Sequence, residues 1–215
     1  MKNRIFTILG ALLIICSALW IFSIKQNENK KRANALEAEK QFEQSISLDE
    51  KKDESQEDVN LTSDDIEEDD VERDDIKSDK AIGVLRIDKL NLLAQVFDNT
   101  ESGSLYDGVG VIESTDLPSS KPGTTCAIAG HRGGVNEELS FLNIDKLEVG
   151  DEIKITTKDE VLLYKVTGSE IIEPDDWSKF TREEDKSKLV LMTCHPYPTD
   201  KERLLGYSEI QSNEN

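Results

Sequence analysis

Two stretches of the sequence combine a nucleophile with cationic side chains. The apolar run KLVLMTC ends at Cys194, and the next apolar run begins at Arg203. Far upstream, the run TTCAIA leads into AGHRGG, which contains His131. An unperturbed thiol has a pKa of about 8.5, and a neighbouring imidazolium or guanidinium raises the fraction of reactive thiolate at neutral pH. These residue types predict that a cysteine attacks a carbonyl and forms a thioester acyl-enzyme.

The stretch between Cys194 and Arg203 predicts that the two side chains meet. The loop HPYPTDKE contains two prolines, which prevent the strand from continuing. If the flanking runs pair as a hairpin, Cys194 and Arg203 face each other at its mouth, and their side chains leave the same face of the sheet. His195 follows Cys194 directly, so in a continuous strand its side chain points to the opposite face. His131 is therefore the better partner for the thiol.

Each of the three side chains has a predicted part in the reaction. Attack by Cys194 on the carbonyl gives a tetrahedral oxyanion. Arg203 donates hydrogen bonds to that oxyanion or to the substrate backbone. His131 lies where a strand runs into a Gly-rich loop, a usual place for functional groups, and its protonated ring passes a proton to the departing amine.

The residues alone leave other interpretations open. Buried cysteines are common in protein cores, which is how we interpret Cys126, and a single histidine or arginine is often structural. A cysteine hydrolase would give the acyl group to water instead of an amine. A non-catalytic, membrane-anchored binding domain would use Cys194, His131 and Arg203 only as structural residues. It would keep its function when Cys194 is replaced by alanine.

Composition and charge exclude several classes of function. The chain has 215 residues and a formal net charge of -19, so a nucleic acid or another phosphate-rich partner is not expected. The sequence has no glycine-rich phosphate loop, and its two histidines are too few for most catalytic zinc sites. The three cysteines lack CxxC spacing, which argues against a disulfide scaffold or a metal knot. We therefore predict no metal and no cofactor.

The N-terminus, residues 1–25, is predicted to be a transmembrane anchor. Residues 5–24 form an uncharged, mostly apolar run, and a helix of this length spans about 30 Å, the thickness of the hydrocarbon core of a bilayer. A cleaved signal peptide, or a lipoprotein signal ending at Cys16, is the less favoured alternative. Basic residues flank the run on both sides, so they do not decide which side of the membrane the rest of the chain faces.

Residues 26–80 are predicted to be an acidic linker. The segment contains no Gly, Pro, Cys or Trp, and its second half reads DDIEEDDVERDDIKSD. Such a segment buries too little apolar surface to offset the entropy of ordering it. The stretch 33–44 is rich in helix formers, so the N-terminal helix is expected to continue as a stalk before the acidic part extends by self-repulsion. An acidic tail that binds calcium or a partner is the alternative.

Residues 81–215 are predicted to form one all-β domain. Short apolar runs alternate with turn residues, and their spacing suits a β-barrel or a β-sandwich. One short helix is predicted near residues 137–147, where leucines recur at helical spacing. The predicted strands are residues 82–87, 90–97, 124–129, 152–157, 161–167, 188–194 and 203–210.

The order of these motifs resembles that of the sortases, the membrane-anchored cysteine transpeptidases of Gram-positive bacteria. AGHRGG, then LVLMTC, then an arginine nine residues beyond the cysteine carry the resemblance, which extends over about residues 81–210. It implies an eight-stranded β-barrel with one or two short helices, on the extracellular side of a membrane that the N-terminal helix crosses once. The family's nucleophile corresponds to Cys194, its histidine to His131 and its arginine to Arg203, and Thr193 matches the threonine before the cysteine.

The resemblance also implies the reaction and its partners. Sortases cleave a sorting signal of the LPxTG type between Thr and Gly, hold the acyl group on the cysteine and pass it to an amine of a cell-wall precursor or a pilin lysine. The partners are then surface proteins or pilins that bear the signal, together with the amine and the membrane. The loop 173–187 falls where family members bind the signal, and its Trp177 and Phe180 are expected to contact the signal or to pin the loop to the barrel.

Two sortase classes fit different features of the sequence. GHRGG and TCHPYPTDKERLL resemble the pilin-polymerising class C enzymes, which usually have a C-terminal membrane helix and a lid with an aromatic anchor. Neither a second apolar span nor a DPW-like lid motif occurs in the sequence, so the topology resembles class A. Wall anchoring and pilus assembly therefore both stay open as functions.

Overall fold

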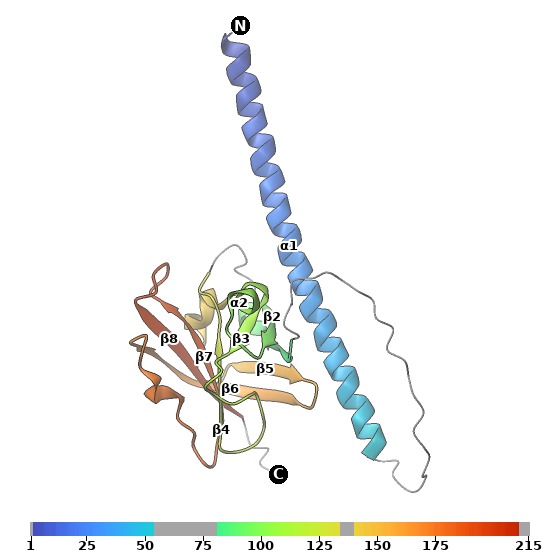
Figure 1. The fold of residues 1–215 in the computed structure, drawn as a ribbon, viewed down its shortest axis with the longest axis vertical. Helices are drawn as coiled ribbons and strands as arrows, with labels where there is room; N and C mark the ends of the chain where they lie inside the picture. Colours follow the sequence, from blue (N-terminus) through green and yellow to red (C-terminus); the bar gives the residue numbers. More distant parts are fainter. Residues whose placement is uncertain (1, 54–80, 134–139, 211–215) are drawn as a thin grey trace.

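A long helix lies beside one closed β-barrel, and its N-terminal part projects beyond the barrel (Figure 1). The computed structural model describes residues 2–53, 81–133 and 140–210, without the side chains at positions 2–9, 11 and 49–53. The strands are β1 (Gly83–Ile87), β2 (Leu92–Phe97), β3 (Val109–Val111), β4 (Thr124–Ala129), β5 (Glu152–Thr157), β6 (Val161–Ile172), β7 (Ser187–His195) and β8 (Glu202–Ile210). The α-helices are α1 (Lys2–Asp53) and α2 (Ser102–Asp107), and the 3-10 helices are η1 (Asp88–Leu90), η3 (Phe141–Lys146) and η4 (Trp177–Phe180).

The eight-stranded barrel implied by the sequence resemblance is confirmed. The strands follow one another in the order β1-β2-β3-β4-β7-β8-β6-β5, and β5 closes the barrel by pairing with β1. All seven predicted strands form, whereas β3 was missed because its three residues, VGV, are too few to show a period. η3 covers the C-terminal part of the predicted helix 137–147, and residues 137–139 of that prediction lie outside the described residues.

Strand alternation explains both the core of the barrel and the contact with α1. Leu85 of β1 and Ile155 of β5 point inward and are fully buried in the core. Val84 of β1 and Leu93 of β2 point the other way and pack against Ala35 of α1, so these two strands have buried residues on both faces. This double burial is why their sequences, GVLRI and LLAQVF, are more apolar than a strictly alternating pattern.

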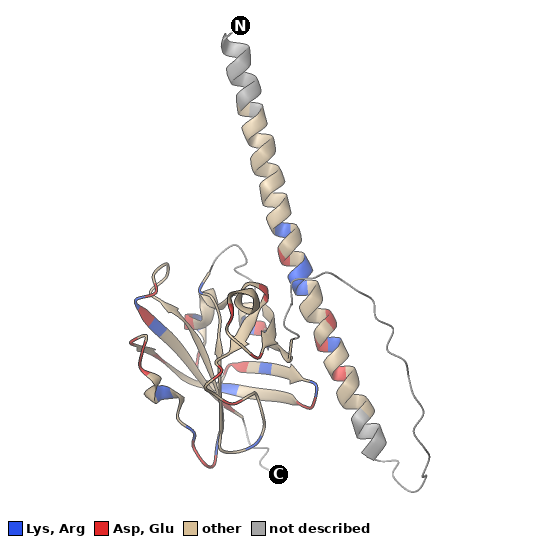
Figure 2. Cartoon of the chain, in the orientation of Figure 1, with Lys and Arg blue, Asp and Glu red and all other residues tan. Residues whose placement is uncertain are grey.

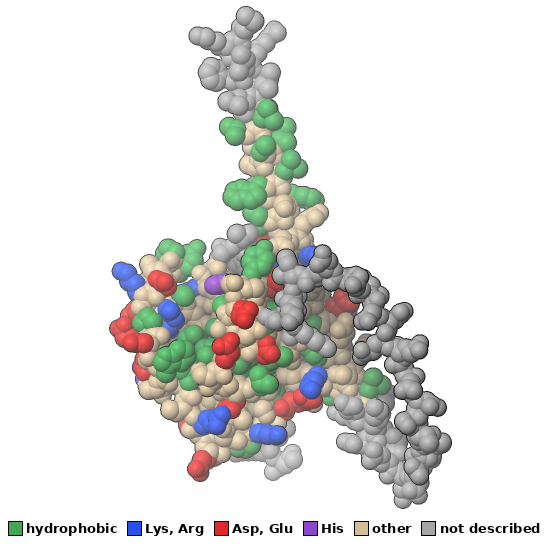
Figure 3. Space-filling view, viewed as in Figure 1, with side chains coloured by type: hydrophobic (Ala, Val, Ile, Leu, Met, Phe, Trp, Pro, Cys, Tyr) green, Lys and Arg blue, Asp and Glu red, His purple; other side chains and the backbone are tan. Residues whose placement is uncertain are grey.

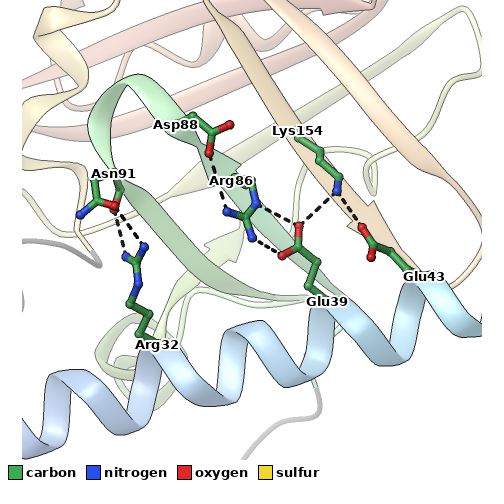
Figure 4. Close-up of polar contacts among 7 residues, drawn as sticks. All are labelled: Arg32, Glu39, Glu43, Arg86, Asp88, Asn91 and Lys154. Atoms are coloured by element: carbon green, nitrogen blue, oxygen red, sulfur yellow. Dashed lines mark hydrogen bonds and ion pairs between the residues drawn. The ribbon is translucent and has the colours of Figure 1, made fainter.

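A buried carboxylate joins α1 to two strands. Glu39 of α1 lies between Arg86 of β1 and Lys154 of β5 (Figure 4), and accepts hydrogen bonds from Arg86 Nε at 3.1 Å and Lys154 Nζ at 3.2 Å. Burial by itself raises the pKa of Glu39, but the hydrogen bonds and charges of Arg86 and Lys154 outweigh it and hold the pKa below its ordinary value. In Figure 2 positions of both charge signs are coloured on α1 and on the strands beside it. The contact of Glu39 with Arg86 and Lys154 fixes the helix against the barrel.

Helix α1 also contacts the short helix α2. The ammonium of Lys31 lies 3.4 Å from the centre of the Tyr106 ring and 3.7 Å from the carboxylate of Asp107. The side-chain amide of Asn27 donates to the Tyr106 hydroxyl at 3.1 Å. Burial lowers the pKa of Lys31, although the nearby Asp107 opposes the shift. Through these contacts α1 supports the helix that carries Leu105, a residue of the active-site cavity described below.

The N-terminal third was predicted to hold a transmembrane anchor at residues 1–25. Within the described residues, no helix combines the length and the apolar composition that crossing a membrane requires. Part of that span, at positions 5–9 and 11, has side chains outside the description. Helix α1 continues through the predicted stalk, residues 33–44, to Asp53. The acidic residues 54–80 lie outside the described residues.

Replacing Glu39 with alanine is expected to weaken the docking of α1 by about 1 to 3 kcal/mol, because Arg86 and Lys154 lose a buried partner. The measurement is hydrogen exchange of the amides of residues 27–45. Docking lowers the pKa of Glu39, so its contribution is full above the ordinary carboxyl pKa of 4.5 and is lost as the pH falls through the lowered pKa. Exchange slows intrinsically at low pH, so the quantity to compare is the protection factor, the ratio of intrinsic to observed rate. The protection factors of these amides in wild-type protein should therefore fall at acidic pH.

The matched control for this prediction is Glu43→Ala. Glu43 also pairs with Lys154, at 2.8 Å, but about half of its side chain is exposed, so its loss costs much less. Unchanged exchange in Glu39→Ala, or equal changes in the two variants, would show that the buried carboxylate does not hold the helix.

Candidate active site

One cavity of about 270 Å³ contains all three residues predicted to carry out the chemistry. Cys194, His131 and Arg203 line it together with Thr193 and Trp177. Cys194 and Arg203 are partly buried, whereas His131 is exposed. The sulfur is thus sheltered at one side of the cavity, and the imidazole can reach solvent.

Two parallel strands bring His131 and Cys194 to the same place. β4 pairs in parallel with the first six residues of β7, up to the pair Ala129 and Met192, so the residues that follow this pair on the two chains lie at the same end of the barrel. Beyond the last pair, the amide of Gly130 donates to the carbonyl of Met192 at 3.1 Å, and the Thr193 hydroxyl donates to the carbonyl of Gly130 at 2.8 Å. These two hydrogen bonds fix the backbone immediately before each functional residue.

The hairpin formed by β7 and β8 places Arg203 directly opposite Cys194, which confirms the predicted pairing. The hairpin is one pair longer than predicted, because His195 pairs with Glu202 and the loop contains only residues 196–201. The cysteine and the arginine therefore belong to regular strands, and the loop lies beyond them.

The family of this barrel follows from comparison with known proteins. A family model described as the Sortase domain matches residues 85–211, more than half of the chain. The chain belongs to the sortase family. The resemblance drawn from the motifs around His131 and Cys194 is thereby confirmed.

Named relatives come from several sortase classes. The chain is 28% identical to Sortase D of Bacillus subtilis (strain 168) over 118 residues, which cover 55% of this chain and 56% of that protein. It is 24% identical to Sortase A of Bacillus anthracis over 197 residues, or 90% of this chain and 88% of the relative. The match with Sortase D thus spans little more than half of that relative's length.

Solved sortase structures have the same fold. The structure of sortase C from Clostridium perfringens SM101 aligns with a TM-score of 0.57 and 30% identity, over 62% of this chain and 71% of that one. Sortase A from Corynebacterium diphtheriae aligns with a TM-score of 0.60 and 27% identity, over 63% of this chain and 62% of that one. The similar proteins therefore include sortases of classes A, C and D.

Two glycines of the sortase motif AGHRGG permit close packing on both sides of His131. A Cβ on Gly130 would lie 2.8 Å from the ring of Phe141, whose amide donates to the carbonyl of His131 at 2.8 Å. Gly133 has a φ of +85°, which favours glycine, and a Cβ there would lie 2.6 Å from the ring of Tyr197. The loop that carries the histidine is thus held between η3 and the β7–β8 loop.

The guanidinium of Arg203 is oriented by the backbone of its own hairpin in this sortase. Its Nη1 donates to the carbonyls of Asp200 and Glu202, at 2.8 Å and 3.0 Å. A guanidinium carries five N–H donors, and these two bonds use only one of its three nitrogens. The group is therefore positioned at the cavity wall before any substrate binds.

The predicted substrate-binding residues divide into two that line the cavity and one that does not. Thr193 is only 3% exposed, and its hydroxyl holds Gly130. Trp177 in η4 lines the cavity and is 55% exposed. The ring of Phe180 lies 5.6 Å from that of Trp177 and packs against the buried cluster around Val190. Phe180 thus pins the loop to the barrel, and substrate contact by Thr193 and Trp177 stays a prediction.

The second histidine and the second cysteine of the barrel have other surroundings. The described residues that line the cavity include His131 but not His195, whose Nδ1 lies 2.6 Å from Arg132 Nη1. Cys126 is buried in the core, where desolvation and, to a smaller extent, Asp116 raise the pKa of its thiol far above the ordinary value. This position agrees with the packing interpretation of Cys126.

Sequence reasoning missed the apolar wall of the cavity. Leu105 of α2, Ile112 after β3 and Met192 of β7 line it. α2 has six residues and β3 has three, which is too short for a periodic signal. In the described ranges, no group of three or more His, Cys, Asp or Glu side chains is arranged to hold a metal ion.

Proposed function

We propose that this sortase is a transpeptidase that cleaves an LPxTG-like sorting signal between Thr and Gly and transfers the acyl group to an amine. The observation that carries the proposal is the cavity in which Cys194, His131 and Arg203 meet. They supply a nucleophile, a group that can move a proton, and a cation with several N–H donors. Together these three components can carry out acyl transfer.

The first half of the reaction forms the thioester. The thiolate of Cys194 attacks the threonine carbonyl carbon, a C–S bond forms, and the carbonyl electrons move onto oxygen. Arg203, on the strand opposite Cys194, donates hydrogen bonds to this oxyanion. The oxyanion then collapses, the C–N bond breaks, and His131 gives its proton to the departing glycine nitrogen.

The second half of the reaction returns the enzyme to its starting state. The acceptor amine attacks the thioester carbonyl, and His131 takes a proton from the nitrogen. The C–S bond breaks, its electrons return to the sulfur of Cys194, and the product is a new amide. The same steps with water give a carboxylic acid, which is the outcome expected of a hydrolase.

The walls of the cavity suit the apolar residues of an LPxTG-like signal. Leu105, Ile112 and Met192 form an apolar surface, and the exposed ring of Trp177 extends it. Such a surface binds leucine and proline side chains by removing them from water. A sortase C from Clostridium perfringens that is 31% identical to this chain was solved with the C-terminal cell wall sorting motif, which supports a signal of this kind.

The proposed partners are surface proteins or pilins that bear the signal, and the amine of a cell-wall precursor or a pilin lysine. We propose that the enzyme meets them on the extracellular side of the cell membrane. Apolar side chains surround the described part of α1 that projects past the barrel (Figure 3), and Leu13, Ile14 and Trp20 are 66%, 70% and 69% exposed. Lipid is the partner that suits this surface.

The location is tested by adding a protease to intact cells. The protease should cleave the barrel if the barrel lies on the extracellular side.

The test of the proposed reaction is incubation of the protein with an LPxTG-type peptide, with and without triglycine. Transfer predicts an amide between the threonine carbonyl and triglycine, identified by mass spectrometry. If peptide release is unaffected by triglycine and no amide forms, the protein is a hydrolase. If no cleavage occurs and the peptide still binds equally well to Cys194→Ala, the domain is a binding module.

A further inference from the structure

The arginine directly after His131 connects three parts of the site. Arg132 Nη1 lies 2.6 Å from Nδ1 of His195 and 3.4 Å from the carbonyl oxygen of Cys194. Its Nη2 lies 3.2 Å from Oδ2 of Asp145 in η3. One guanidinium thus contacts the end of β7 and η3 from the loop that carries the histidine.

The surroundings of Arg132 are unusual for a residue that serves only stability. Its side chain is 7% exposed, and its carboxylate partner among the described residues, Asp145, is 48% exposed. Among the described residues, Arg132 Nε has no hydrogen-bond partner. Removing a guanidinium from water without a full set of partners is costly, and an apolar side chain of similar size would be cheaper to bury. The contacts of Arg132 with Cys194 and His195 therefore point to a role in the site.

Arg132 extends the connection between the parallel strands β4 and β7 past their last pair, Ala129 and Met192. The hydrogen bonds of Gly130 with Met192 and Thr193 fix the chain before His131 and before Cys194. Arg132 contacts the backbone of Cys194 itself, one residue further along. Fixing the chain on both sides of the histidine limits how far the imidazole can move from the sulfur.

We propose that Arg132 is a positioning residue that sets the distance between His131 and Cys194. Nδ1 of His195 accepts one of its hydrogen bonds. A guanidinium only donates hydrogen bonds, so Nδ1 of His195 must accept and the proton of the neutral ring is on Nε2. This assigns His195 a part in the site without making it the base. The proposal rests on the acyl-transfer function proposed above.

The test compares four full-length proteins: wild type, Arg132→Ala, Arg132→Lys and the control Arg32→Ala. Arg32 lies on α1 and donates to Asn91, 3.0 Å from its side-chain oxygen. The readouts are kcat and KM for transfer to triglycine, thermal unfolding, and the ¹⁵N NMR signals of the His195 ring, which report which nitrogen carries the proton.

Arg132→Ala is expected to lower kcat by about 30 to 100-fold and to change KM by less than about threefold, because misplaced groups slow the reaction without weakening ground-state binding. Arg132→Lys keeps the charge but not the planar fork of donors, so its kcat should fall by about 10-fold. The His195 signals should change in both variants. Arg32→Ala should stay within about twofold of wild type for kcat and leave the His195 signals unchanged.

Three results would overturn the proposal. They are a kcat within about threefold of wild type in folded Arg132→Ala, a rise in KM alone, and a loss of activity that matches the unfolded fraction. If Arg132→Ala does not fold, an unchanged kcat with unchanged His195 signals in Arg132→Lys is decisive against it. The NMR arm needs no substrate. If wild-type protein has no transfer activity, the proposed function is refuted. The NMR signals of His195 still show whether Arg132 contacts its ring.

Discussion

Replacing Cys194 with alanine is expected to abolish acyl transfer, with a fall in rate of about four orders of magnitude or more. Without the sulfur no thioester forms, and the neighbouring groups retain only the ability to bind substrate. The measurement is intact-protein mass spectrometry after incubation with an LPxTG-type peptide. Wild-type protein should gain the mass of the acyl fragment, peptide mapping should locate it on Cys194, and the variant should stay unmodified.

The two other cysteines provide the controls for this result. Cys16 is exposed on α1, so all proteins should carry Cys16→Ser to remove a second accessible thiol. Cys126 is 1% exposed, and burial keeps its thiol protonated, so Cys126→Ala should still form the adduct and keep most of the activity. An adduct on the Cys194→Ala protein, or complete loss of the adduct in a folded Cys126→Ala protein, would contradict the assignment of the nucleophile.

Replacing His131 with alanine is expected to lower kcat for transfer by about two to four orders of magnitude, the range for loss of general acid–base catalysis. In the proposed mechanism both halves of the reaction move a proton between an amine and this ring, so thioester formation and amide formation should both slow. Arg203→Ala should cost about two to three orders of magnitude, because it removes the guanidinium opposite Cys194 that is proposed to donate to the oxyanion. The measurement is single-turnover kinetics of each half-reaction, with circular dichroism to show that the barrel is folded.

His195→Ala is the matched control for the histidine. His195 is adjacent to Cys194 in sequence but does not belong to the described residues that line the cavity, and it is one of several partners of Arg132. Its loss should therefore lower kcat by less than about 10-fold. Equal damage from His195→Ala and His131→Ala would show that the wrong histidine has been assigned as the acid and base.

Local sequence was sufficient for the part of the site that lies on one hairpin. The prolines after Cys194 end β7, and alternation along two consecutive strands places Arg203 opposite the cysteine. Most strands were also predicted because an apolar run bounded by turn residues is a local signal. The segments β3 and α2 were missed because a few residues show no period. The apolar wall around Leu105 was missed for the same reason, because α2 carries Leu105.

The role of charged residues depended on contacts that no local pattern reveals. In the sequence Glu39 is one of many charges in a helix-forming stretch, and Arg132 is one basic residue in a Gly-rich loop. Each is buried only because another part of the chain packs over it: the β1 and β5 strands over Glu39, and η3 with the end of β7 over Arg132. Burying a charge has a large free-energy cost unless the charge is paired, and the neighbouring residues in the sequence do not show whether it is buried.

By itself, the sequence determined the residue types proposed for the chemistry and the pairing of Cys194 with Arg203, because each depends on residues close together in the chain. It also determined the family resemblance, because that depends on the order of the motifs along the chain and not on their contacts. Only the tertiary structure decided that His131 lies in the same cavity as Cys194. That result requires parallel pairing of β4 with β7, which brings Gly130 and Thr193 into contact from 63 positions apart. The free energy of such a pairing comes from the whole barrel core, and no single stretch of sequence contains it.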